Sequence, residues 1–237
     1  MLFLVTGAAG FIGSHVASGL LDDGHDVVGV DSLNDYYDVG LKHARLARLT
    51  SRDRFRFEQI DLENPNSLLD LDVRDDVDRV IHLAAQAGVR YSLEKPFAYV
   101  ASNVTGHLSV LEFCRHAAKQ PFLAYASSSS VYGDTTPVPF NEDADVRRPV
   151  SLYAATKIAD ELMSETYATL YGLRSFGMRF FTVYGPWGRP DMAYWSFTEK
   201  ILQGEPIRVF NGGKMKRDFT FIDDAVSAVL SMALAED

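Results

Sequence analysis

The fold of this chain is decided by the stretch Thr6-Gly7-Ala8-Ala9-Gly10-Phe11-Ile12-Gly13, in which three glycines follow a short apolar run. Glycine lets the backbone turn tightly and approach a pyrophosphate, and the N-terminus of the next helix offers unpaired N–H groups to that charge. A glycine turn that only packs a helix on a strand is the plainer alternative. The position of the turn, directly after an expected strand, favours a dinucleotide site. Its contacts are expected from Gly7, Gly10, Phe11, Ile12 and Gly13.

Apolar runs and segments of helical periodicity alternate along the rest of the chain. The expected strands, rich in Val, Ile, Leu and Phe, are Leu2–Thr6, Asp26–Val30, Arg54–Gln59, Arg79–Ala84, Phe122–Ala126 and Arg174–Phe181. The expected helices between them include Ile12–Leu21, Tyr99–Ala117 and Tyr153–Tyr171. This alternation predicts an α/β fold in which a doubly wound parallel sheet of the Rossmann type carries helices on both faces.

Asp31 ends the second expected strand, 18 residues past Gly13. At this place in a dinucleotide fold a carboxylate meets the hydroxyls of the adenosine ribose and would repel a 2′-phosphate. The sequence therefore predicts NAD, not NADP, as the cofactor.

The composition narrows the partners of the chain. Its 237 residues carry a formal net charge of −9, which argues against a nucleic-acid partner because phosphate backbones are held by clustered Lys and Arg. Its longest apolar stretches fall short of the roughly 20 residues of a membrane helix, so no membrane partner is expected. Cys114 is the only cysteine, which excludes an intrachain disulfide and favours the cytoplasm. No metal ion is expected.

The residue composition changes beyond about Tyr184, where Gly, Pro and isolated aromatic residues become frequent. This composition predicts loops and short elements over one end of the sheet, followed by a last helix that starts at Asp223. We therefore expect residues 1–182 to form the NAD-binding domain and residues 183–237 to belong to a substrate-binding region.

Two further patterns suggest catalytic groups. Tyr153 and Lys157 are four residues apart on an expected helix, so they project from one face, and the ammonium would lower the pKa of the phenol toward neutrality. The run Ser127–Ser130 follows the fifth strand, at the sheet edge where doubly wound folds place their chemistry. An exposed Tyr–Lys pair and a serine cluster that only forms a turn are the plainer alternatives.

The G-x-x-G-x-x-G spacing resembles that of extended short-chain dehydrogenase/reductases of the NAD-dependent epimerase/dehydratase family. Two other cofactor signatures of that family appear in order, Asp61-Leu62 after the third expected strand and His82-Leu83-Ala84-Ala85 in the fourth and just after it. The resemblance implies that Asp61 and Leu62 meet the adenine, and that Leu83, Ala84 and Ala85 meet the pyrophosphate-ribose side. It also implies that Ser128, Tyr153 and Lys157 are the catalytic residues and that the last two contact NAD.

Four uninterrupted sequence segments make the chain most similar to UDP-glucuronate 4-epimerases. They are Asp31–Asp38, Gln86–Ser92, Phe180–Met192 and Lys214–Phe219. The resemblance implies that UDP-glucuronate becomes UDP-galacturonate through a 4-keto intermediate, with NAD retained throughout. It assigns the UDP-sugar to Arg90, Ser128, Ser129, Ser130, Thr182, Arg189 and Arg217, although Arg189 could instead be a loop arginine that pairs with Asp191.

Related activities remain as alternatives. Dehydratases carry Asp-Glu, and UDP-glucuronate decarboxylases a Glu, where this chain has Ser129 and Ser130, so the missing carboxylates favour epimerisation. A UDP-glucose 4-epimerase is the main alternative, although many sugar epimerases have Asn in place of Thr182. An NAD-binding regulatory or scaffold protein is the non-enzymatic alternative.

The resemblance further implies a homodimer through the helices Tyr99–Ala117 and Tyr153–Tyr171, and a substrate-binding lobe that is incomplete at its C-terminal end.

Overall fold

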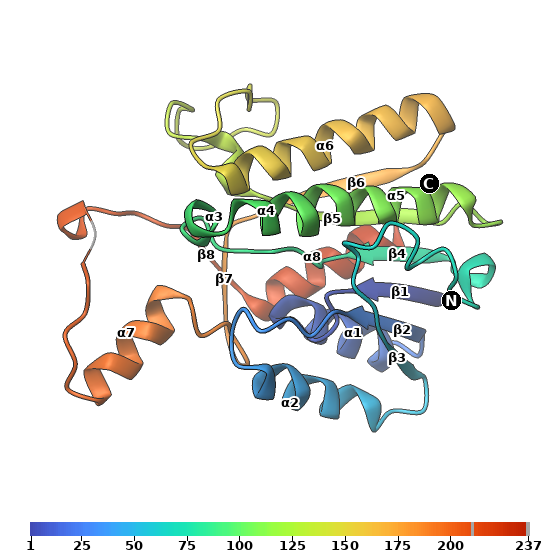
Figure 1. Ribbon diagram of the computed structural model, residues 1–237, viewed down its shortest axis with the longest axis horizontal. Helices are drawn as coiled ribbons and strands as arrows, with labels where there is room; N and C mark the ends of the chain where they lie inside the picture. Colours follow the sequence, from blue (N-terminus) through green and yellow to red (C-terminus); the bar gives the residue numbers. More distant parts are fainter. Residues whose placement is uncertain (210, 236–237) are drawn as a thin grey trace.

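A six-stranded parallel sheet forms the centre of the computed structural model, which describes residues 1–209 and 211–235 (Figure 1). The strands are β1 (Leu2–Thr6), β2 (Asp26–Asp31), β3 (Phe55–Gln59), β4 (Arg79–His82), β5 (Phe122–Ser128) and β6 (Ser175–Phe180). The strand order is β3-β2-β1-β4-β5-β6. Strands β1 to β3 are added toward one edge of the sheet and strands β4 to β6 toward the other, and this switch between β1 and β4 confirms the doubly wound fold. All six expected strands are present, with ends that differ by at most two residues.

Helices cover both faces of the sheet because successive side chains of each strand point to opposite sides. Leu4 packs in the cluster beneath α5 (Gly106–His116) and α6 (Leu152–Tyr171). Its neighbours Phe3 and Val5 pack against α1 (Phe11–Asp22) and α8 (Ile222–Leu234). Helix α2 (Val39–Thr50) was missed in the sequence because its buried face carries Lys42 and Arg45 beside two leucines.

The expected helix Tyr99–Ala117 is more irregular than its periodicity indicates. Two short helices, α3 (Tyr91–Glu94) and α4 (Pro96–Tyr99), lead into the π-helical segment η2 (Val100–Thr105) before α5 begins. π-Helical turns occur often at functional sites. Here the segment places the buried Asn103 side chain against Gln86, where it pairs with both the backbone N–H and the carbonyl.

Residues beyond β6 contribute both to a small second sheet and to the core of the large sheet. A second sheet pairs β7 (Thr182–Tyr184) with β8 (Phe219–Phe221), and α7 (Ala193–Leu202) extends away from the main body (Figure 1). Helix α8 instead packs on α1 and joins the core of the large sheet, although the sequence placed it in the substrate-binding region. The remaining short helices are η1 (Arg74–Asp76), η3 (Ser129–Tyr132) and η4 (Asn211–Gly213). Among the described residues, no helix has the length and apolar character needed to span a bilayer.

Candidate active site

The carboxyl ends of the parallel strands open into a cavity of about 1610 Å³. Such an edge, beside the point where strand order reverses, is where doubly wound sheets bind their ligands. Every residue that the sequence assigned to cofactor, substrate or catalysis lines this one cavity. The sequence patterns therefore converge on a single site, although they come from segments between Gly7 and Arg217.

The glycine-rich turn forms a close-fitting cradle at one side of the cavity. Gly7 has a φ of +72°, and a Cβ there would lie 2.8 Å from the backbone nitrogen of Ala84. A Cβ on Gly13 would lie 2.0 Å from the carbonyl oxygen of Gly7. Helix α1 then begins without a side-chain cap, so its first N–H groups stay available to an anion. The turn thus fits a pyrophosphate.

Asp31 is held in a fixed orientation at the end of β2. Its two carboxylate oxygens accept hydrogen bonds from the backbone N–H groups of Ala9 (3.2 Å) and Leu33 (2.9 Å). The ammonium of Lys42 lies 4.0 Å from the same carboxylate and donates to Asn34 at 2.7 Å. The carboxylate lines the cavity, as required of a group that binds ribose hydroxyls.

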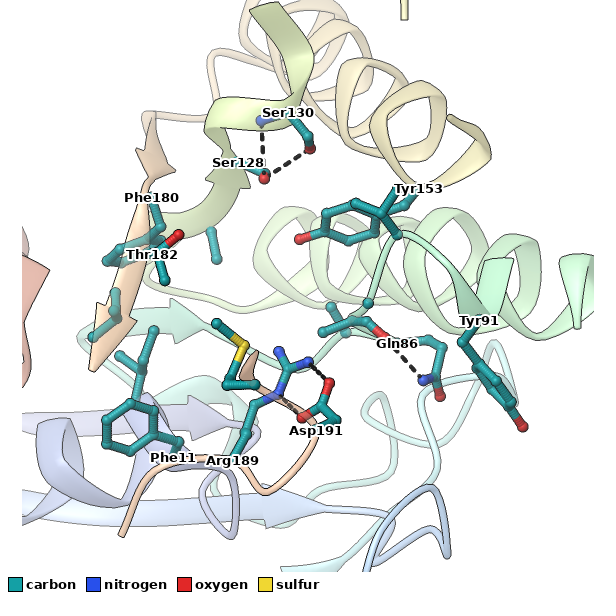
Figure 2. Close-up of a pocket in the computed structure, with 18 of the residues that line it drawn as sticks. Phe11, Gln86, Tyr91, Ser128, Ser130, Tyr153, Phe180, Thr182, Arg189 and Asp191 are labelled. Carbon is teal, nitrogen blue, oxygen red and sulfur yellow. Dashed lines mark hydrogen bonds and ion pairs between the residues drawn. The ribbon is translucent and has the colours of Figure 1, made fainter. Parts of the chain in front are cut away.

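Ser128 and Tyr153 lie on opposite sides of the inner cavity (Figure 2). Ser128 ends β5, and its hydroxyl oxygen accepts hydrogen bonds from the backbone N–H of Ser130 (3.2 Å) and from the Ser130 hydroxyl (2.8 Å). The phenol of Tyr153 points from α6 toward the side of the cavity that holds Ser128 and Thr182. The ring of Tyr99 braces it edge-on, with centroids 6.1 Å apart. The hydroxyl groups of Ser128 and Tyr153 thus face the same cavity.

Lys157 has a buried partner that the sequence analysis missed. Its ammonium donates to the carboxylate of Asp160 at 3.0 Å, and the two side chains are 2% and 0% exposed. Burial raises the pKa of Asp160 to about 6, although the lysine opposes this shift. The i,i+3 spacing on a helix was the signal that could have revealed the pair.

Arg189 both faces the cavity and forms the ion pair that was the alternative to substrate binding. Its Nε donates to Asp191 at 3.0 Å, and Nη2 donates to the other carboxylate oxygen. Asp191 also accepts from the hydroxyl of Tyr36 at 3.1 Å. Figure 2 shows the remaining guanidinium nitrogen directed into the cavity. The ion pair thus leaves one edge of the cation available, and Tyr36 is a member of the site that the sequence analysis missed.

The comparisons with known proteins identify the family. A model of the NAD dependent epimerase/dehydratase family matches residues 3–237. The chain belongs to this family. UDP-glucuronate 4-epimerase 1 of Arabidopsis thaliana is 53% identical over 230 residues, which make up 96% of this chain and 53% of that protein. Protein CapI of Staphylococcus aureus is 52% identical over 229 residues, 97% of this chain and 68% of that protein.

Solved structures agree with this membership of the epimerase/dehydratase family. The crystal structure of UDP-glucuronic acid 4-epimerase from Bacillus cereus, in complex with UDP-glucuronic acid and NAD, matches with a TM-score of 0.89 at 35% identity. The match covers 100% of this chain and 74% of that chain. A UDP-glucose 4-epimerase from Thermotoga maritima matches with a TM-score of 0.86 at 30% identity, and also covers 100% of this chain and 74% of that chain.

Arg90 and Arg217 lie in more exposed parts of the cavity wall than the other expected substrate-binding residues. Arg217 donates to the backbone carbonyl of its neighbour Lys216 at 2.8 Å. Ser129 and Ser130 belong to η3 and line the cavity. The roles of these residues toward a UDP-sugar remain predictions.

Near Lys157 lie two buried histidines, His82 and His107, whose ring centroids are 5.2 Å apart. Burial, and in addition the charge of Lys157, lowers the pKa of His82 to about 3. Burial also holds the pKa of His107 well below its usual value. His82 accepts or donates a 2.7 Å hydrogen bond with the Thr6 hydroxyl, whereas its Nε2 has no partner among the described residues. Both rings are therefore neutral in the folded protein.

We expect these histidines to make the protein less stable as pH falls from 7 to 5. The unfolded chain takes up protons near pH 6.5 and the folded one does not, so each histidine lowers the free energy of unfolding by about 2 kcal/mol over this interval. Asp160, with its raised pKa, opposes this change by about 1 kcal/mol. Urea unfolding at the two pH values measures the difference, and an unchanged free energy of unfolding would contradict the neutral pair.

Proposed function

We propose that the chain catalyses the 4-epimerisation of UDP-glucuronate to UDP-galacturonate. The observation that carries this proposal is the placement of Arg189 and Thr182 in the same cavity as Ser128 and Tyr153. A carboxylate on the sugar would then meet a cation and hydroxyl donors while the 4-hydroxyl lies between the two catalytic oxygens. The name of the Arabidopsis relative and the ligands of the Bacillus cereus structure support this substrate.

The residues that would hold NAD follow from the shape of the cavity. The cradle of Gly7, Gly10 and Gly13 and the open N-terminus of α1 fit the pyrophosphate, and Asp31 fits a ribose diol. Asp61, Leu62 and Leu83–Ala85 line the same cavity as Ser128, Tyr153 and Lys157, and the resemblance assigns them to the cofactor. When bound, NAD supplies a hydride acceptor that returns the hydride to the other face of the same carbon.

The protein groups supply the proton chemistry. Tyr153 accepts the proton of the sugar 4-hydroxyl, and Ser128 donates a hydrogen bond to the same oxygen. Lys157 places a positive charge behind the phenol and stabilises its ionised form, while Asp160 holds that ammonium from the opposite side. Tyr153 then returns the proton when the sugar has presented its other face.

The test of this function is incubation of the purified protein with UDP-glucuronate, followed by chromatographic separation of the C4 epimers. We expect UDP-galacturonate to appear without net reduction of added NAD. Conversion of UDP-glucose with greater efficiency would favour the UDP-glucose 4-epimerase alternative, and no turnover of either sugar would favour the NAD-binding regulatory protein.

The purified protein is expected to retain NAD, because an epimerase needs its hydride for the return step. Acid extraction and an enzymatic cofactor assay would measure the NAD and NADP that are released. The fixed carboxylate of Asp31 would repel a 2′-phosphate, so Asp31→Asn should weaken the discrimination against NADP. Recovery of NADP alone from the unmodified protein would contradict the role of Asp31.

A homodimer through α4–α5 and α6 also belongs to this proposal. These neighbouring helices expose the apolar side chains Phe97 (85%), Leu108 (39%) and Leu162 (58%), and burial of exposed apolar side chains against another protein is favourable. A second copy of the chain is the partner that we propose for these helices. Analytical ultracentrifugation tests the homodimer, and a monomer at micromolar concentration would contradict it.

A cytoplasmic location remains a prediction from the cysteine content.

A further inference from the structure

We infer that Arg45 is a positioning residue, which fixes the Arg189 loop (residues 185–191) against the glycine-rich turn and thereby determines selectivity for a uronate. The inference rests on the proposed function, since it concerns how Arg189 is presented to the sugar. Arg45 lies on α2 and does not itself line the cavity. Any effect on the substrate must therefore pass through the loop.

Arg45 is fully buried, with 0% exposure, and no described residue forms an ion pair with it. A buried guanidinium is costly unless its donors are satisfied. Its Nε and Nη2 donate to the carbonyl of Trp187 at 3.1 and 2.6 Å, and Nη2 also donates to the carbonyl of Gly188 at 3.3 Å. Its Nη1 donates to the carbonyl of Ala9 at 3.1 Å and to the hydroxyl of Tyr37 at 2.6 Å. These five bonds match the five N–H donors of the group.

The loop that Arg45 holds has an unusual backbone conformation. Trp187 has a φ of +64°, in the left-handed region that large side chains rarely adopt. Such strain persists only where the surroundings impose it, and it concentrates at functional sites. Here Arg45 binds the carbonyl of Trp187, and the guanidinium of Arg48 lies 5.0 Å above its ring. Both contacts come from α2, where Arg45 and Arg48 are three residues apart and therefore lie on one face of the helix.

The strained residue lies two positions before Arg189. The backbone of the loop therefore sets where the guanidinium of Arg189 enters the cavity, and Asp191 then orients it. Arg45 also contacts the carbonyl of Ala9, between the glycines that form the cofactor cradle. One buried side chain thus joins the nucleotide-binding turn to the loop that carries the cation for the sugar carboxylate. A lysine could not replace it, because an ammonium has only three donors on a single nitrogen.

Arg45→Met tests the inference, with Arg52→Met as the matched control. Arg52 follows the same helix and forms an exposed ion pair with Asp22. The measurements are the dissociation constants of UDP-glucuronate and UDP-glucose by titration calorimetry on the NAD-loaded full chain, with the melting temperature and retained NAD recorded for each variant. We expect Arg45→Met to weaken UDP-glucuronate binding about 10-fold more than UDP-glucose binding, because a displaced Arg189 guanidinium would lose its hydrogen bond to a carboxylate that only UDP-glucuronate carries. Arg52→Met should leave the ratio unchanged.

A rescue experiment separates positioning from general destabilisation. Glycine adopts a positive φ without strain, so Trp187→Gly in the Arg45→Met background should restore part of the lost preference for the uronate. Arg45→Lys, made in parallel, keeps the charge and should still lose the preference. Equal losses for the two sugars in a folded Arg45 variant, or no recovery with glycine, would overturn the inference. A wild-type protein that prefers UDP-glucose would instead overturn the proposed function, so the two failures are distinguishable.

Discussion

Replacing Tyr153 by phenylalanine is expected to lower turnover of UDP-glucuronate by about 10²-fold or more, with NAD still bound. The substitution removes the oxygen that, in the proposed mechanism, accepts the proton of the sugar 4-hydroxyl. The aromatic ring keeps its edge-on contact with Tyr99, so the shape of the cavity is preserved. The loss should appear mainly in kcat, because the phenol acts in the chemical step.

Tyr99→Phe is the matched control for this experiment. It removes a hydroxyl from the neighbouring ring; this hydroxyl donates to the carbonyls of Ala87 and Gly88, and Tyr99 does not line the cavity. We expect this variant to keep most of its turnover and to lose some thermal stability. A Tyr153→Phe protein with near-normal turnover would eliminate Tyr153 as the base. Loss of NAD from that variant would show that it fails through cofactor binding.

Arg189→Leu is expected to lower kcat/KM for UDP-glucuronate by about 10- to 150-fold, because hydrogen bonds to a charged group are typically worth about 1.5–3 kcal/mol. UDP-glucose has no carboxylate at this position and should be affected much less. Thr182→Asn should act in the same direction with a smaller effect, since it exchanges a hydroxyl donor for an amide. Both substrates are to be assayed with each variant, and equal losses would contradict the carboxylate contact.

Asp191→Asn is the control that separates charge from orientation. It retains a side chain that can accept from Arg189 but removes the anion that now pairs with it. If Asp191 only orients the guanidinium, the preference for the uronate should persist or increase, because the cation is less neutralised. A loss as large as that of Arg189→Leu would show that the ion pair itself, rather than the free edge of Arg189, serves the substrate.

Much of the fold and site could be predicted because the relevant signals are local. Strand β1, the glycine turn and the start of α1 are consecutive, and Tyr153 and Lys157 share one helix face. Helix α2 escaped prediction because two cations on its buried face interrupt the apolar period. The partnership of Lys157 with Asp160 was local as well, but spacing alone does not reveal that both side chains are buried.

The sequence by itself determined the parallel sheet, the glycine-rich turn and the shared helix face of Tyr153 and Lys157, because short-range backbone geometry and side-chain periodicity control these features. The choice of Ser128 within its serine run came from the resemblance to the family. Only the tertiary structure decided how Arg189 is presented. Its partner Asp191 meets Tyr36 across 155 positions of the chain, and Arg45 reaches Trp187 across 142 positions. No sequence period encodes such pairs, because they form only when the parallel strands bring the loops at their carboxyl ends to one edge.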